Sequence, residues 1–376
     1  MIDILKPQKD FWLSSCFNYE DMAWATPKHS KRKVNDAGDL LTGRANIDRI
    51  SEDEAFEIIK NWRDAHTYPL VVMKRLLRRR AIKIDADCNV VHRIKRLESI
   101  KNKLLLHPVK LSQMQDIGGC RAILKDIDAV KKTIEIYKNN SRDIKHELID
   151  EYDYITIPRK SGYRGHHLVY RFVGDKVKDF DGLKIEVQIR SQFQHAWATT
   201  VETVDTITKQ SLKSNFVDND WSRFFALMGS AFAIMEHCEL VPGCPQNVND
   251  MEKEIAESEK KLKVIDKLTA FNRYLKIQEK ELAASNYYIL ILNFKEQTIK
   301  VKGYNELKAA SFDYNQLERE IIGDESKNIV LVSAESTESL RNAYPNYYLD
   351  TSNFVHLLRA IISVYEKRIK KKNQKK

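Results

Sequence analysis

The chain has 376 residues, of which 43% are hydrophobic and 31% are charged, and its formal net charge at pH 7 is +10. These values exclude a disordered chain, leave room for two domains, and favour an anionic partner such as a nucleotide or a nucleic acid. The longest uncharged apolar run, FFALMGSAFAIM, is shorter than the roughly 20 residues that span a bilayer, and the first residues lack a signal-peptide pattern. We therefore expect a cytoplasmic protein without membrane contact, and the five scattered cysteines fit that compartment.

The first 50 residues read as irregular, and a helical segment is predicted to follow them. Ser51 can cap this segment, and Glu54 stands three residues later as in a capping box. Two basic clusters lie in this part of the chain. Their members are Lys28, Lys31, Arg32 and Lys33 in the first, and Arg78, Arg79 and Arg80 in the second. Both clusters suit the phosphates of a nucleic acid, and solvated surface charge is the alternative.

The segment HRIKRLESIKNKLLLHP, residues 92–108, is predicted to be a helix. Lys95, Ser99 and Lys103 recur at i, i+4 and i+8, so they would share one face. Two ammonium groups with a hydroxyl between them could hold a polyphosphate, and a solvated basic face is the alternative. The guanidinium planes of Arg93 and Arg121 could lie flat on an adenine ring.

From Cys120 to Arg190 the pattern changes to short apolar segments, which predict strands. They are CRAILKD, YDYITIP, HHLVYRFV and LKIEVQIRS. Helices are expected to resume at about Gln192 and to continue to Glu239. Strands and helices in this order indicate a fold of the α/β (α+β) class, with a mixed sheet flanked by helices.

The segment LVPGCPQNVND interrupts this pattern, and a long charged helix is predicted from Asp250 to about Ala284. A second small unit follows, with a hairpin from NYYILILNF and TIKVKGY, a helix, the strand KNIVLVSAE and a last helix. We therefore predict a first domain over residues 1–245, a helical linker over 246–285 and a ββαβα-like domain over 286–376.

Two carboxylates are candidates for a catalytic metal site. Asp116 precedes two glycines and a strand, and Glu186 lies on the polar face of LKIEVQIRS beside Gln188 and Arg190. Hard oxygen ligands together with nucleotide phosphates are how Mg²⁺ is usually held. The alternatives are a helix-terminating turn at the glycines and a solvated polar strand face. No GxxxxGK[ST] or GxGxxG motif occurs, so side chains would have to hold the phosphates.

The loop PRKSGYRGHHLVYRF, residues 158–172, places Tyr163 between two glycines and surrounds it with cations. A structural turn needs the glycines but neither the ring nor the charge. We predict that the glycines let this loop approach a base, on which Tyr163 stacks, and that Arg164 neutralises a nearby phosphate.

These motifs, in this order, resemble the RelA/SpoT-homologue synthetases. They are a RxKxxxSxxxK segment, DxxGxR, a Gly-Tyr loop, ExQIRS and His-x-Trp-Ala, and the resemblance covers roughly residues 50–240. It implies a pyrophosphokinase that moves the β,γ-diphosphate of ATP to a ribose hydroxyl with the help of Mg²⁺. It also implies the role of each matching residue. Asp116 and Glu186 are the catalytic metal ligands; Arg93, Lys95, Ser99, Lys103 and Arg121 bind ATP; Tyr163, Arg164, His167, Gln188 and Arg190 bind the acceptor; His195 and Glu202 support them.

The layout also resembles the toxic branch of that family, which includes the fused toxin–antitoxin proteins called CapRel. This implies an autoinhibited enzyme that modifies the 3′ CCA end of tRNA, blocks translation and aborts phage infection. Its trigger would be a phage major capsid protein bound by the C-terminal, pseudo-zinc-finger domain. NAYPNYY resembles the YxxY motif that restrains this branch, with Tyr344 and Tyr347 as its members, and local packing is the alternative. A synthetase that makes (p)ppGpp or ppApp from a mononucleotide remains the rival function.

Overall fold

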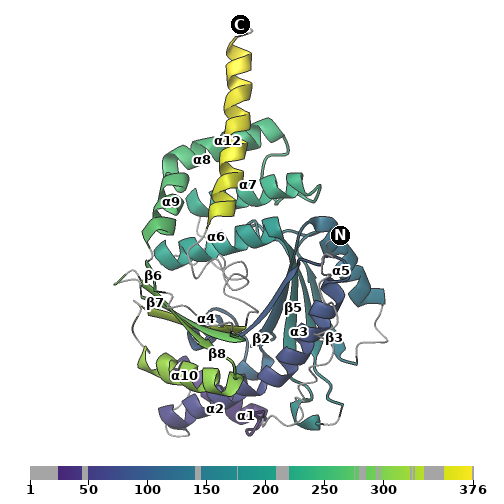
Figure 1. Cartoon of the computed structure of the whole chain (residues 1–376), viewed down its shortest axis with the longest axis vertical. Coiled ribbons are helices and arrows are strands. Elements are labelled where there is room, and N and C mark those ends of the chain that lie inside the picture. Colours follow the sequence, from purple (N-terminus) through teal and green to yellow (C-terminus); the bar gives the residue numbers. More distant parts are fainter. Residues whose placement is uncertain are drawn as a thin grey trace, which may run out of the picture.

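A computed structural model describes most of the chain (Figure 1). The described residues are 24–44, 50–139, 145–175, 177–208, 220–274, 276–278, 285–293, 296, 298–321, 324, 327–333 and 351–374. Tyr344 and Tyr347 lie outside them, so their predicted role stays a prediction. Within the described residues, no helix combines the length and the apolar character needed to cross a bilayer.

One mixed sheet runs through the molecule, and within the described residues it has nine strands in the order β3-β4-β5-β2-β1-β9-β7-β8-β6. Its strands are β1 Asn89–Ile94, β2 Gly118–Leu124, β3 Glu147–Asp153, β4 His166–Arg171, β5 Lys184–Ser191, β6 Lys276–Gln278, β7 Tyr287–Asn293, β8 Thr298–Tyr304 and β9 Lys327–Ser333. Strands β2 and β5 are parallel, as are β6 and β8, and the other neighbours are antiparallel. The predicted mixed α/β fold is confirmed.

Three helices precede the first strand, and the others are interspersed among the strands. They are α1 Lys31–Leu41, α2 Glu52–Ala65, α3 Thr67–Ala81, α4 Leu97–Leu106, α5 Ile127–Asn139, α6 Gln192–Thr208, α7 Asp220–Met235, α8 Val248–Leu262, α9 Val264–Tyr274, α10 Leu307–Glu320 and α12 Ser352–Asn373. The predicted cap of α2 is confirmed, because the Ser51 hydroxyl accepts a hydrogen bond of 3.2 Å from the Glu54 N–H. Such a cap satisfies a backbone donor that the first turn of a helix leaves free.

Helices α3 and α5 cover one face of the sheet (Figure 1). Leu70, Met73 and Leu77 of α3 are fully buried against strand residues such as Leu168 and Val187. Because side chains alternate along a strand, the intervening residues of β2, β4 and β5 point to the opposite face. That opposite face carries the polar residues of the predicted site.

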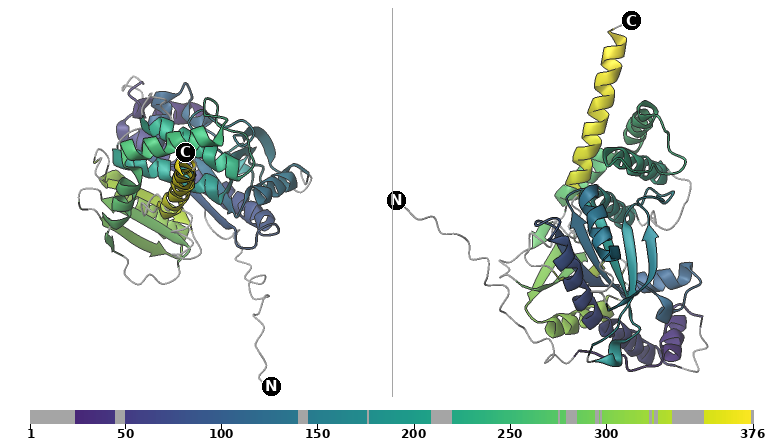
Figure 2. Two further views of the ribbon diagram at one scale, coloured as in Figure 1. Left: turned by 90° about the horizontal axis from the view of Figure 1, so that it is seen from above. Right: turned by 90° about the vertical axis from the view of Figure 1, so that its right-hand side faces the viewer.

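Helices α6, α7, α8, α9 and α12 form a separate layer above the sheet (Figure 1). Its core contains the rings of Phe224, Phe225, Phe232 and Phe354, the last of which comes from α12. The far end of α12 projects beyond the rest of the described chain (Figure 2). The C-terminal segment therefore separates into two parts. The first part extends the sheet with β7, β8 and β9, against which α10 packs, whereas α12 packs on the helical layer.

Several elements differ from the sequence predictions. Residues 92–94 belong to strand β1, where they pair with β2, and the predicted helix begins only at Leu97. The strand predicted at YDYITIP lies earlier, at Glu147–Asp153. The helix predicted from Asp250 is broken at Lys263, which has a φ of 52°. In each case a contact made far along the chain, or a single backbone dihedral, overrides the local pattern.

Candidate active site

Strand register brings the predicted site residues into two rows on the open face of the sheet. In the first row, Tyr152 of β3 pairs with His167 of β4, which pairs with Gln188 of β5. Gln188 in turn pairs with Arg121 of β2. In the second row Glu186 pairs with Gly119, which pairs with Arg93. Paired residues share a face, so the rows bring Arg93 and Arg121, predicted to bind ATP, onto the same face as His167 and Gln188, predicted to bind the acceptor.

Both carboxylate oxygens of Glu186 are bonded to residues of the first row. Its Oε1 lies 2.8 Å from His167 Nδ1, and its Oε2 accepts from Gln188 Nε2 at 2.7 Å. Arg121 Nε donates to Gln188 Oε1 at 3.1 Å. Because an ionised carboxylate can only accept, His167 Nδ1 carries a proton and donates it to the hydrogen bond with Glu186. His167 and Gln188, on neighbouring strands, thus both bond to the carboxylate of Glu186.

The network continues through Tyr163. Its hydroxyl lies 2.5 Å from His167 Nε2 and accepts from Arg190 Nη2 at 2.5 Å. The Tyr163 hydroxyl therefore joins Arg190 to His167, and His167 joins it to Glu186. The Arg190 guanidinium also lies over the Tyr163 ring, 5.1 Å from its centroid. Tyr163 therefore acts here through its hydroxyl as well as its ring.

Glu186 is held ionised by its partners. Burial alone would raise its pKa, but the charge and the hydrogen bond of His167, with Gln188 and Lys95, outweigh burial and hold the pKa far below its usual range. Asp116 behaves in the same way. Burial would raise its pKa, and Lys95 and Lys103 hold it below the usual value. Two ionised carboxylates therefore stand in a largely buried site at neutral pH.

Asp116 is the second centre of charge. Its Oδ2 lies 2.9 Å from the ammonium nitrogens of both Lys95 and Lys103. Its Oδ1 is buried, and in the described part of the chain it has no hydrogen-bond partner. Lys95 and Lys103 thus converge as predicted, although Lys95 precedes the helix and only Ser99 and Lys103 lie on α4.

These residues fit a divalent cation. No group of three or more His, Cys, Asp or Glu side chains in the described chain could form an all-protein metal site. Mg²⁺, however, is usually held by one or two carboxylates together with substrate phosphates and water. The free Oδ1 of Asp116 offers one ligand. A Cβ at Gly119 would have only Glu186 atoms nearby, at 3.9 Å, so the space beside Glu186 is open. Asp116 and Glu186 would hold Mg²⁺, which would offset phosphate charge.

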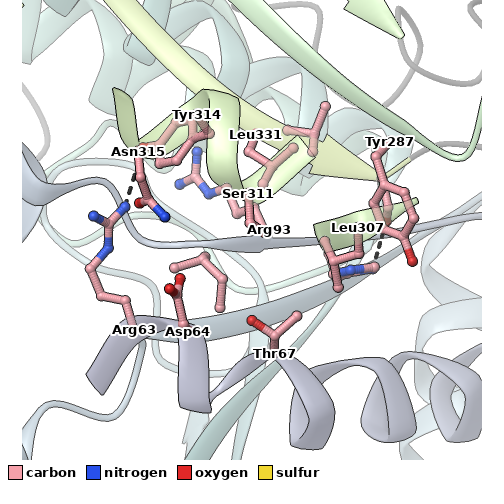
Figure 3. Close-up of a pocket in the computed structure, with 14 residues that line it drawn as sticks. Arg63, Asp64, Thr67, Arg93, Tyr287, Leu307, Ser311, Tyr314, Asn315 and Leu331 are labelled. Carbon is pink, nitrogen blue, oxygen red and sulfur yellow. Dashed lines mark hydrogen bonds between the residues drawn. The ribbon is translucent and has the colours of Figure 1, made fainter. Parts of the chain in front are cut away.

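Arg93 lines a pocket between the first part of the chain and the C-terminal strands (Figure 3). The other lining residues come from α2, α3, β1, β7, α10 and β9, and they include Arg63, Thr67, Tyr314, Leu331 and Val332. Strand β9 pairs with β1 at this point, with Val332 opposite Arg93 and Ser333 opposite His92. The C-terminal strands therefore extend the sheet beside Arg93, at the predicted adenine-binding end of the site.

Gly162 and Trp197 fix the loop that carries Tyr163. Gly162 has a φ of 95°, a value that favours glycine, and a Cβ there would lie 2.6 Å from the Phe225 carbonyl oxygen. Trp197 of α6 donates to the same oxygen at 2.8 Å, and its ring meets the Tyr163 ring edge-on. Gly162 is thus required by the close approach of this loop to α7, and the predicted stacking of a base on Tyr163 stays a prediction.

Two predicted contacts are corrected by the structure. Arg164 is 3% exposed, and its Nη1 donates to Glu236 at 2.8 Å, so it holds the loop to the turn after α7 instead of lying at the surface. Arg80 is also buried, and its guanidinium lies 4.7 Å from the centroid of the Tyr137 ring. Neither of these cations can meet the phosphates of a partner without unfolding its surroundings.

The other predicted residues fall into two groups. His195 is buried on α6, and Glu202 lies half-buried seven residues later on the same helix. The second group contains the remaining residues predicted to contact a nucleic acid. Arg78 is half-buried, and the other five are exposed. The exposed ones are Lys28, Lys31, Arg32, Lys33 and Arg79.

Sequence reasoning missed residues on both sides of the site. Tyr152 and Tyr154, on and just after β3, contact the site face, as described below. The alternation in DEYDY, residues 150–154, could have identified them, because it places Asp150, Tyr152 and Tyr154 on one side of a strand. Arg63 and Glu318 form a buried ion pair behind the site. No local pattern identifies a pair that is 255 residues apart.

Comparison with known proteins agrees with this geometry. Residues 92–206 match the protein family described as "Region found in RelA / SpoT proteins". The GTP pyrophosphokinase YjbM of Bacillus subtilis (strain 168) is 32% identical over 116 residues, which are 29% of this chain and 52% of that protein. The GTP pyrophosphokinase YwaC of the same organism is 26% identical over 132 residues, which are 31% of this chain and 61% of that protein.

The chain thus spans little more than half the length of these curated relatives. A crystal structure of small alarmone synthetase 2 from Bacillus subtilis is 20% identical and covers 47% of this chain and 94% of its own, with a TM-score of 0.40. The matched region contains every residue of the two rows on β1, β2, β4 and β5. Residues 92–206 of this chain are therefore similar to the region found in RelA / SpoT proteins, and two GTP pyrophosphokinases resemble the chain over part of their length.

Proposed function

We propose that this chain is a pyrophosphokinase that transfers the β,γ-diphosphate of ATP to a ribose hydroxyl. The observation that carries the proposal is the convergence of two charged networks on one open sheet face. One ends on Glu186, and the other joins Asp116 to Lys95 and Lys103. The names of YjbM and YwaC as GTP pyrophosphokinases support the same reaction type.

In this reaction the acceptor oxygen forms a bond to the β-phosphorus, the bond to the α,β-bridging oxygen breaks, and AMP leaves. Glu186 accepts the hydroxyl hydrogen bond and takes its proton as the new bond forms. Lys95 and Lys103 release Asp116 and offset the charge of the transferred phosphates. Because Glu186 is strongly held as an anion, its main contribution is to orient the hydroxyl, and positioning carries most of the catalysis.

For the acceptor we propose the 3′ CCA end of tRNA, so that the product blocks translation and the protein acts as an anti-phage toxin. The exposed cations at Lys28, Lys31, Arg32 and Lys33 support an extended polyanionic partner. A second candidate is a mononucleotide such as GTP, which the names of the curated relatives favour. The two candidates differ in whether the acceptor extends beyond one nucleotide.

We further propose that the C-terminal strands restrain the enzyme and that a phage major capsid protein releases it. Support comes from the pairing of β9 with β1 beside Arg93 and from the ion pair between Arg63 and Glu318. The restrained and released forms would be in equilibrium, and a trigger shifts that equilibrium only if it binds the released form more tightly. Truncation from residue 285 would be a poor test, because it also removes α12 and the Phe354 ring from the helical core.

The test uses the full chain and a full-chain Glu318→Gln variant, each with Mg²⁺ and ATP labelled on the γ-phosphate. Deacylated tRNA, tRNA without its terminal adenosine, GTP, GDP and AMP are offered separately. Label on intact tRNA alone supports the tRNA acceptor, and label on a mononucleotide alone replaces it with an alarmone synthetase. Glu186→Gln is the control, and undiminished transfer by that variant would contradict the assigned role of Glu186.

A further inference from the structure

Two tyrosines and an arginine form an aromatic and cationic ladder at one edge of the site. The rings of Tyr152 and Tyr154 are nearly parallel, with an interplanar angle of 6° and centroids 6.0 Å apart. The guanidinium of Arg159 lies 4.3 Å from the centroid of the Tyr154 ring and donates to its hydroxyl at 2.5 Å. Tyr154 therefore contacts both other members of the ladder, Tyr152 and Arg159.

The ladder is continuous with the Glu186 network. The Tyr154 ring meets the rings of Tyr163 and His167 edge-on, with centroids 5.6 Å and 5.5 Å away. Tyr152 pairs with His167 in the strand register, so the two side chains share the site face and stand about 5 Å apart along the hydrogen-bonding direction. A chain of nucleotides whose last ribose reaches Glu186 would pass over this edge.

The ladder is held in place by polar contacts rather than by an apolar core. The Tyr152 hydroxyl donates to Gln115 Oε1 at 3.1 Å, and Gln115 in turn donates to Asp150. Asp153 caps the turn that follows, accepting from the Ile155 and Thr156 N–H groups at 3.0 Å. The rings are thus preorganised, and less free energy would be lost in ordering them when a partner binds.

The ladder is also accessible. The two tyrosines are only half-buried, and Arg159 and its neighbour Lys160 are exposed. Strand β3 is at one edge of the sheet, and strands β4, β5, β2 and β1 lie between it and β9. The C-terminal strands beside Arg93 therefore lie on the other side of the sheet's centre from Tyr152. Two half-buried rings that only stabilised the fold would not need two exposed cations beside them.

We propose that Tyr152 and Arg159 are a stacking surface for single-stranded RNA, where they receive the bases that precede the terminal nucleotide of the acceptor. This inference rests on the proposed function and specifies how a polynucleotide differs from a mononucleotide at the same site. Flat aromatic and guanidinium faces stack on any base, and nearby cations attract the phosphates between the bases. A mononucleotide has a single base, which is predicted to stack on Tyr163, so it has no further base to stack on Tyr152.

The test measures binding to the full chain, without ATP, of a six-nucleotide RNA that ends in CCA and carries a fluorophore at its 5′ end. Stacking of a base on an aromatic ring contributes about 1–3 kcal/mol, so Tyr152→Ala should raise the Kd for this RNA by roughly 5- to 150-fold. Tyr152→Phe keeps the ring and should stay within about twofold of the unmodified chain. Ile157→Ala, at a site that is 74% exposed in the same loop, is the matched control and should change nothing.

GTP and AMP binding is measured on the same variants. Unchanged mononucleotide affinity in Tyr152→Ala, together with weaker RNA binding, supports the stacking surface. RNA affinity equal to that of the unmodified chain, no RNA binding by that chain, or an equal loss for RNA and mononucleotides would overturn it. If RNA binding depends on Tyr152 but labelled diphosphate passes only to GTP, the stacking surface stands and the tRNA acceptor fails.

Discussion

Arg63 of α2 and Glu318 of α10 form an ion pair of 2.6 Å between side chains that are 4% and 9% exposed. Glu318 also accepts from the Tyr314 hydroxyl at 2.7 Å and from the Leu97 N–H at 3.1 Å. Arg63 Nε donates to the Lys95 carbonyl at 3.1 Å. Burial alone would lower the pKa of Arg63 and raise that of Glu318. The attraction between the two charges is stronger than this effect, so the pKa of Arg63 is raised and that of Glu318 is lowered. The pair thus links α10 to the turn that carries Lys95.

The first prediction concerns this link. Glu318→Gln leaves Arg63 buried without its counter-charge, so the free energy of unfolding should fall by about 3 kcal/mol. Denaturant unfolding measures this loss, and hydrogen exchange should show the largest gain in β9 and α10. Arg319→Gln is the matched control, because Arg319 is an exposed neighbour that contacts Asp53 and Glu57 at the surface. That variant should be indistinguishable from the unmodified chain.

The same variant tests the proposed restraint. If the C-terminal strands hold the enzyme inactive, Glu318→Gln should increase diphosphate transfer while it lowers stability. Activity that falls in step with stability would instead show that Glu318 only braces the Lys95 turn, and the proposed autoinhibition would lose its structural basis.

The second prediction separates the ring of Tyr163 from its hydroxyl. Tyr163→Phe keeps a stacking face but removes the hydroxyl that lies 2.5 Å from His167 Nε2 and accepts from Arg190. We expect kcat for diphosphate transfer to fall about 10- to 100-fold, because a hydrogen bond that orients a catalytic group contributes one to a few kcal/mol. The KM for the acceptor should change much less. Unchanged kcat with a raised KM would restore the stacking role that the sequence predicts.

The sequence predicts best the parts of the site that follow a local period. Strict alternation in LKIEVQIRS identifies the face shared by Glu186 and Gln188, and β5 has the predicted bounds to within one residue. The convergence of Lys95 and Lys103 is also predicted, but for an incomplete reason. Lys95 reaches Asp116 from the turn after β1, since pairing with β2 makes a strand of residues that continue a helical period in the sequence.

Contacts between distant segments could not be predicted in this way. The cations of PRKSGYRG look alike in the sequence, yet Arg159 is exposed and Arg164 is buried. The difference arises because Arg164 meets Glu236, which is 72 residues away in the turn that follows α7. Likewise, nothing local to α12 indicates that it leaves the C-terminal strands to pack its Phe354 ring against Phe224 and Phe232.

The third prediction is a loss of stability in mild acid. His66, at the junction of α2 and α3, is 1% exposed, and its Nδ1 donates to the Trp62 carbonyl at 2.7 Å. Burial lowers its pKa to about 4, although the Trp62 bond opposes that shift. Between pH 6.5 and 4 the unfolded chain therefore binds a proton that the folded chain does not. Stability should fall by about 3 kcal/mol as the pH drops through this window.

His66→Gln can keep the bond to Trp62 without titrating, so its unfolding free energy should depend less steeply on pH between 6.5 and 4. Some dependence should remain, because burial also lowers the pKa of His92. Denaturant midpoints at pH 7, 5.5 and 4.5 give the comparison. A slope identical to that of the unmodified chain would show that His66 is protonated without unfolding.

The fourth prediction concerns the glycine that positions the Tyr163 loop. Gly162 and Gly182 both have left-handed backbones, with φ of 95° and 86°, so alanine is strained at either position. They differ in their surroundings. A Cβ at Gly162 would lie 2.6 Å from the Phe225 carbonyl oxygen and 3.0 Å from Trp197, whereas a Cβ at Gly182 meets nothing within 4 Å. Gly182→Ala should therefore cost about 1 kcal/mol from backbone strain alone.

Gly162→Ala should cost clearly more, because the loop must also move away from α7, and Tyr163 moves with it. The hydrogen bonds of Tyr163 to His167 and Arg190 would lengthen, so diphosphate transfer should fall even where the variant is fully folded. Denaturant unfolding gives the two free energies, and label transfer at a temperature well below both melting points gives the activities. Equal losses of stability in the two variants would mean that the contact between this loop and α7 does not constrain the site.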